Sequence, residues 1–198
     1  MADLRLSFFA IAAAMAALAS LPVAVFAQYS ADNRGSASSS AAVPDFYGIR
    51  PATVECVIEA AKKQGVPANV LLAIASVEGG KNGQIVENKN GSYDLGHLQI
   101  NSIHFLPNGR FGNLPITRED VTWRGCYNAE LAAWMLRQHL DEPGSQQDFW
   151  TRAANYHSRT PEHNARYRQK LVSLSVAWGD WLKKWYVAQG VPFIADSK

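Results

Sequence analysis

A single carboxylate, Glu78, stands at the end of a strongly apolar run and just before two glycines. Leu71, Ile74 and Ala75 precede it with i, i+3, i+4 spacing, and Glu78 follows at i+7, so it shares the buried face of a helix. Burial disfavours the charged form of a carboxyl group and raises its pKa. Such a group can donate a proton to a leaving oxygen near neutral pH. The alternative is a glutamate that forms a salt bridge at a helix end.

A polar, glycine-marked segment follows, and it carries a second carboxylate, Asp94. Cleavage of a glycosidic bond needs a proton on the leaving oxygen and stabilisation of an oxocarbenium-like centre. A hydrolase uses a second carboxylate for that stabilisation or as a nucleophile, with the two carboxyl groups roughly 5–10 Å apart. The alternative for Asp94 is a turn residue that accepts backbone N–H bonds. These residues alone leave both alternatives open.

Three motifs, in order along the chain, resemble those of enzymes that cut cell-wall glycans. The run Asn88–Ser102 (NKNGSYDLGHLQINS) resembles the active-site hairpin of c-type lysozymes, and its Gly96–Gln99 is similar to the Gly-Leu-Met-Gln segment of soluble lytic transglycosylases. Ala153–His157 (AANYH) resembles the transglycosylase Ala-Tyr-Asn motif, aligned on its tyrosine. The phrase YHSRTP, with Tyr167 downstream, is similar to small transglycosylases that accompany conjugation and type IV secretion machinery. The resemblance covers about residues 50–175.

The resemblance implies roles for particular residues. It makes Glu78 the acid and base, with Asp94 aligned on the second carboxylate of c-type lysozymes, and it places Tyr156 near the catalytic carboxylate. The substrate-binding residues that we expect are Asn88, Gln99, Asn101, Tyr156 and His157. This chain also departs from the family pattern, because Gly79-Gly80 replaces the usual Ser-Ser, Leu98 the methionine, and His157 the asparagine.

Three functions remain open, and we favour the first. A lytic transglycosylase cleaves the MurNAc–GlcNAc bond with Glu78 alone and leaves a 1,6-anhydro end, without consuming water. A lysozyme-type muramidase uses Glu78 and Asp94 and consumes water. A non-catalytic peptidoglycan-binding assembly factor needs neither. We expect no cofactor and no metal, because none of the five histidines forms a metal-ligand spacing.

The predicted fold class is α+β and mostly α, which the resemblance makes lysozyme-like, with a small β-hairpin beside the active-site cleft. Asn90-Gly91 indicates a hairpin turn within residues 84–101. Helices are predicted over 52–63, from 67 or 68 to 78, over 117–123, 126–140, 147–156 and 160–188, with a brief helical turn at 102–106.

The last of these helices carries an apolar stripe with steps of four and three residues: Tyr167, Leu171, Leu174, Trp178, Trp181 and Trp185. We interpret this stripe as a seam facing the core. The alternative is a platform on which sugar rings stack.

The N-terminal residues predict export. Residues 1–27 have the charge, apolar core and Val-Phe-Ala ending of a cleaved signal peptide, 28–45 form a flexible Ser/Ala-rich leader, and 46–198 form the catalytic domain. We therefore expect a periplasmic or secreted protein that is not inserted in a membrane after cleavage. In that compartment the even pair Cys56 and Cys126 predicts a disulfide, with two buried thiols as the alternative.

Net charge limits the partners that we expect, and chain length limits the number of domains. A formal net charge of +2 does not predict nucleic-acid binding. With 198 residues the chain is long enough for one domain of ordinary size. We expect a monomer whose partner is the glycan strand of peptidoglycan, together with components of a secretion or conjugation apparatus.

Overall fold

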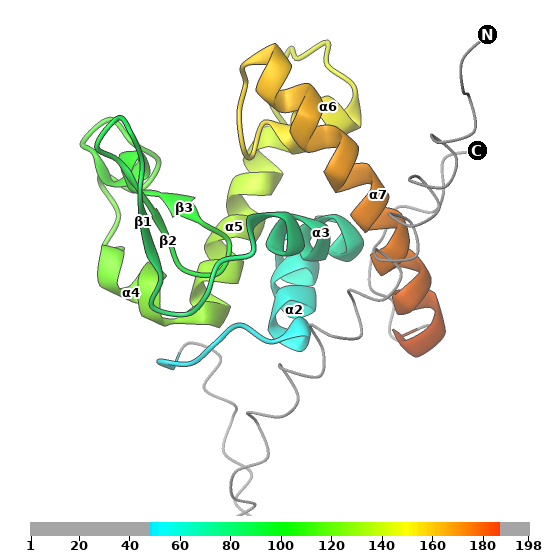
Figure 1. Cartoon of the computed structure of the whole chain (residues 1–198), viewed down its shortest axis with the longest axis horizontal. Helices are drawn as coiled ribbons and strands as arrows, with labels where there is room; N and C mark the ends of the chain where they lie inside the picture. Colours follow the sequence, from blue (N-terminus) through cyan, green and yellow to red (C-terminus); the bar gives the residue numbers. More distant parts are fainter. Residues whose placement is uncertain (1–47, 187–198) are drawn as a thin grey trace, which may run out of the picture. The chain divides into compact units, whose positions relative to one another are not determined.

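The computed structural model describes residues 48–186, apart from the side chains of the last two (Figure 1). The predicted signal peptide and leader, and residues 187–198, lie outside the described residues. The elements are α2 (Val54–Gln64), α3 (Ala68–Glu78), β1 (Ile85–Glu87), β2 (Tyr93–Leu95), β3 (Ile100–Asn101), η1 (Ser102–Phe105), α4 (Arg118–Trp123), α5 (Gly125–Leu140), α6 (Phe149–Ala154) and α7 (Pro161–Tyr186). The mostly helical α+β class is confirmed.

Helix α3 lies in the core over its first two turns. Every residue from Ala68 to Ile74 is buried, and the helix packs against α2, α5 and α7 (Figure 1). Pro67 precedes its first turn, where the missing N–H costs no hydrogen bond. Gly79 ends it in the left-handed conformation, with φ of 59°. The helix therefore runs from the core to a sharp stop, and Glu78 is its last residue.

A disulfide ties α2 to α5. Cys56 and Cys126 are bonded, with their Cα atoms 5.5 Å apart and 70 residues apart in sequence, which confirms the pairing predicted from export. The Cys56 sulfur also caps α2, because it accepts a hydrogen bond from the Thr53 N–H at 3.1 Å. The bridge holds these two helices beside α3, against which both pack.

The polar segment after α3 forms a three-stranded antiparallel sheet in the order β1-β2-β3. The predicted hairpin is present, with Val86 opposite Asp94 and the Asn90-Gly91 turn between the strands. The third strand was not predicted, because two residues are too few to show a period of two. Asp94 is also paired with Asn101 on β3, so it occupies the central strand.

The stripe on α7 faces the core at its buried residues, while the side chain of Trp185 lies outside the described part of the chain. Tyr167, Leu171 and Trp178 are buried, and the Trp178 Nε1–H donates to the Ser76 hydroxyl on α3 at 2.9 Å. Trp181 is half-buried and meets Trp178 edge-on. A sugar platform therefore does not exist along the buried part of this seam.

The bounds of α6 differ from prediction at both ends. Helix α6 is shorter than the predicted 147–156, because the Asp148 side chain accepts the Thr151 N–H at 3.0 Å and so caps the helix from outside it. Helix α7 is described to Tyr186, and the last predicted residues lie outside the described range. Within residues 48–186, no helix is both long and apolar enough to cross a bilayer.

Candidate active site

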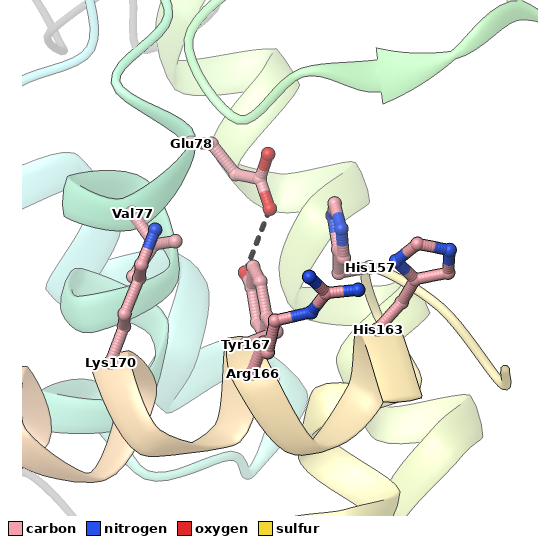
Figure 2. Close-up of a pocket in the computed structure, with 7 residues that line it drawn as sticks. All are labelled: Val77, Glu78, His157, His163, Arg166, Tyr167 and Lys170. Atoms are coloured by element: carbon pink, nitrogen blue, oxygen red, sulfur yellow. Dashed lines mark hydrogen bonds between the residues drawn. The ribbon is translucent and has the colours of Figure 1, made fainter. Parts of the chain in front are cut away.

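The carboxyl group of Glu78 accepts a hydrogen bond from a tyrosine 89 residues further along the chain. The Tyr167 O–H donates to Glu78 Oε1 at 2.7 Å (Figure 2). Tyr167 itself is only 5% exposed, so packing on α7 fixes the position of its hydroxyl. The packing of α7 against α3 brings the two side chains together, and the hydrogen bond orients the carboxyl group of Glu78.

The environment of Glu78 raises its pKa to about 7. Burial is the main cause, since it disfavours the charged carboxylate. The hydrogen bond from Tyr167 acts in the opposite direction, and the negative charge of Asp94 adds to the rise. Near neutral pH, Glu78 therefore exists in both protonation states, as an acid that must later serve as a base requires.

Tyr167→Phe is expected to move the alkaline limb of the pH–rate profile upward by roughly half a unit to one unit. The Tyr167 hydrogen bond lowers the pKa of Glu78, and a bond of this kind is worth about 1 kcal/mol. Without it Glu78 keeps its proton to higher pH. Initial rates of wall lysis between acid and alkaline pH measure the limb.

The control for this variant is Tyr156→Phe. The Tyr156 O–H donates to the Leu98 carbonyl at 2.8 Å and not to Glu78, so its removal should leave the alkaline limb in place. A limb that stays put in Tyr167→Phe would contradict the assignment of the limb to Glu78.

Gly80 leaves the space in which the β2–β3 turn packs beside the end of α3. A Cβ atom on Gly80 would lie 2.1 Å from the Gly96 carbonyl oxygen and 2.6 Å from the Gln99 side-chain nitrogen. The Gly80 N–H donates to the His97 carbonyl at 3.2 Å. This close approach explains why glycine replaces the family serine at this position, and it brings the β2–β3 turn beside the end of α3.

Gly80→Ser is expected to destabilise the fold by about 2–4 kcal/mol, because backbone atoms would have to move to admit the side chain. Urea unfolding measures the loss. Gly79→Ser is the matched control, since a Cβ there meets only Ser76 O at 3.9 Å and the cost is the left-handed backbone, with φ of +59°. That strain should cost about 1 kcal/mol. Equal losses in the two variants would contradict the close approach.

Hydrogen bonds hold the β2–β3 turn from two sides. Buried Asn128 on α5 accepts the Leu98 N–H and donates to the Leu95 carbonyl, both at 2.9 Å. The Tyr156 hydroxyl donates to the Leu98 carbonyl at 2.8 Å. Gln99 takes a strained φ of 48° in this turn, with its amide nitrogen donating to the Gly96 carbonyl at 2.7 Å.

Asp94 belongs to a polar network on the sheet. Its Oδ1 accepts from the Asn101 Nδ2 at 2.7 Å. Asn101 also donates to the Ser92 hydroxyl, which accepts a further bond from Asn88. The charge of Asp94 nonetheless acts on Glu78, so the two carboxylates are electrostatically coupled across the site.

A cavity of about 270 Å³ opens beside Glu78. His157 lines it and lies flat on the Tyr167 ring, with ring centroids 4.7 Å apart and an interplanar angle of 2°. The other lining residues are Val77, His163, Arg166 and Lys170 (Figure 2). The histidine that replaces the family asparagine therefore packs against the tyrosine that binds Glu78.

Two of the predicted site residues line the cavity, and the rest lie outside its lining. Glu78 and His157 line the cavity, while Asp94 acts on Glu78, Tyr156 and His157 by charge. The others lie in the hairpin and turn: Asn88, Gln99 and Asn101 make hydrogen bonds within that segment.

Sequence reasoning missed two supporting residues. Tyr167 was assigned to the core seam, and its end position in that stripe carried no sign that its hydroxyl reaches Glu78. Asn128 is in helical register with the buried residues Leu131, Ala132 and Met135 of α5, and that position was an available signal, because a buried amide must be hydrogen-bonded.

Comparisons with known proteins identify the family of this domain. A family model described as "Transglycosylase SLT domain" matches residues 55–170, which include every predicted site residue and Tyr167. Protein IpgF of Shigella flexneri is 28% identical over 117 residues, covering 59% of this chain and 73% of the relative. Invasion protein IagB of Salmonella typhimurium strain LT2 is 28% identical over 123 residues, covering 62% of this chain and 73% of the relative.

Proposed function

The chain belongs to the transglycosylase SLT domain family and is a peptidoglycan lytic transglycosylase, and on that premise we propose that Glu78 is its acid and base. The observation that carries the proposal is the half-buried carboxyl group with a pKa of about 7 beside a cavity. The Tyr167 hydroxyl orients it. The bond cleaved is the β-1,4 linkage from MurNAc to GlcNAc.

The reaction uses Glu78 twice. The protonated carboxyl group first gives its proton to the bridging oxygen, and the bond from that oxygen to the muramyl C1 breaks. The resulting carboxylate then takes the proton of the muramyl C6 hydroxyl, whose oxygen bonds to C1 and closes a 1,6-anhydro ring. Glu78 ends protonated, as it began, and no water is consumed. Proton transfer of this kind supplies about 10²–10⁴-fold of rate.

A second candidate is a muramidase that hydrolyses the same bond with Glu78 and Asp94. The coupling between the two carboxylates favours it, since the charge of Asp94 contributes to the pKa of Glu78. Against it stands the engagement of Asp94 with Asn101, which suits a residue that shapes the sheet. We therefore assign Asp94 a structural and electrostatic role.

Product masses decide between the two reactions. Digestion of purified wall by the wild-type protein is expected to give anhydro-muramyl ends, which are one water lighter than reducing ends. Asp94→Asn should keep these products and lower the rate by roughly tenfold or less, because only its charge and one hydrogen bond change. Reducing ends alone, together with a near-complete loss of activity in Asp94→Asn, would establish the muramidase instead.

The cellular role that we propose is local opening of the wall for a secretion or conjugation apparatus. Support comes from the YHSRTP phrase and from a relative whose name is Invasion protein IagB. Export through the signal peptide at residues 1–27 would bring the enzyme to its substrate. A mature protein whose N-terminus, read by mass spectrometry, is still Met1 would contradict that export route.

A further inference from the structure

One face of α7 places three basic residues next to the catalytic acid. His163, Arg166 and Lys170 follow i, i+3, i+7 spacing, and all three line the cavity that contains Glu78. Figure 2 shows them rising from α7 on both sides of Tyr167, with Lys170 toward Val77 and His163 toward His157. We call His163, Arg166 and Lys170 the basic rim.

The charge of the basic rim is only partly offset. Among the described residues, Arg166 forms the one ion pair of the rim, with Glu162 at 2.8 Å, and both partners are largely exposed. An exposed pair of this kind is weak and exchanges readily with another anion. The rim lies close enough to His157 to affect its pKa. Burial lowers that pKa, His163 and Lys170 lower it further, and Asp94 opposes them.

The basic rim does not serve to ionise Glu78. The pKa of Glu78 reflects burial, the Tyr167 hydroxyl and Asp94, and it lies above the usual value. Cations that acted strongly on this carboxylate would hold its pKa down instead. The rim residues are therefore not among the groups that set the pKa of Glu78.

The substrate class supplies a matching anion. The N-acetylated sugar rings of a peptidoglycan strand are uncharged, and its carboxylates lie on the peptide that is attached to the lactyl group of each muramyl residue. A chain with a net charge of only +2 has no general attraction for polyanions. Basic side chains gathered at the cavity of the catalytic acid thus fit a carboxylate of that peptide.

We propose that the basic rim binds a carboxylate of the stem peptide carried by the muramyl residue at the scissile bond. The inference rests on the proposed function and adds the part of the substrate that the enzyme selects. Arg166 and Lys170 lie about one helical turn apart on α7, and a bond from either cation to a carboxylate is charge-assisted and therefore strong. Glycan strands that carry peptides are then better substrates than bare strands.

The test compares two substrates and two double variants. The substrates are purified wall glycan with its stem peptides and the same glycan after an amidase has removed them. Arg166→Gln with Lys170→Gln is expected to raise KM roughly tenfold on the peptide-bearing glycan and less than about twofold on the bare glycan, with little change in kcat. Raising the salt concentration should reduce the wild-type preference between the substrates.

Lys62→Gln with Lys184→Gln is the matched control, because it removes the same charge from exposed positions that do not line the cavity. It should leave KM unchanged on both substrates. Equal losses on both substrates in the rim variant, or no loss on either, would overturn the inference alone. A wild-type protein that cleaves neither substrate would overturn the proposed function, and this inference with it.

Discussion

Glu78→Gln is expected to lower the rate of wall cleavage by about 10²–10⁴-fold while the protein still binds peptidoglycan. The amide keeps the shape of the side chain and can still bond to the Tyr167 hydroxyl, which lies 2.7 Å from Glu78 Oε1. It has no proton to give to the bridging oxygen and no charge with which to take one back. Release of soluble fragments from purified wall measures the rate, and sedimentation with insoluble wall measures binding.

Stability of the same variant provides a control that does not depend on activity. The pKa of Glu78 is raised from 4.5 to about 7 in the folded protein, so the folded state binds a proton more tightly than the unfolded chain. The stability that Glu78 contributes is therefore fully present below pH 4.5 and is lost as pH rises through 7. Relative to the wild type, Glu78→Gln should gain about 3 kcal/mol across that window.

Two results would contradict the assignment. A Glu78→Gln protein that clears peptidoglycan as fast as the wild type would show that a different group is the acid. A stability difference that stays constant between acid and alkaline pH would show that Glu78 titrates with its ordinary pKa. Urea unfolding at several pH values measures that difference.

Removal of the disulfide is expected to cost about 4 kcal/mol of folding free energy. The bridge from Cys56 to Cys126 spans 70 residues, and the entropy that it removes from the unfolded chain grows with loop length. Serine at both positions is the suitable change, because a hydroxyl at residue 56 can still accept the Thr53 N–H at the start of α2. Urea unfolding of the double variant measures the loss.

Reduction of the wild type gives an independent measurement of the same energy. A thiol reductant should lower the unfolding midpoint of the wild type to near that of the double serine variant, and it should leave the variant unchanged. A reduced wild type with an unaltered midpoint would show that helix packing alone holds α2 against α5.

The sequence by itself determined the features that depend on local spacing. The i, i+3, i+4, i+7 pattern placed Glu78 in register with the buried face of α3, and the two glycines marked where that helix ends. The Asn90-Gly91 turn indicated the hairpin that carries Asp94. The cysteine pair followed from export, which is a statement about compartment rather than geometry. Each of these signals lies within a few residues or in composition.

Only the tertiary structure decided what surrounds Glu78. Its hydrogen-bond partner lies 89 residues away on α7, and the turn that fits against Gly80 is set by Asn128 on α5 and by Tyr156. Burial and the charge of Asp94 raise the pKa of Glu78 to about 7, against the opposing effect of the Tyr167 hydrogen bond. No local pattern encodes such contacts, because they arise when separate helices pack. The sequence therefore singled out Glu78, and packing gave it a pKa that suits the proposed role.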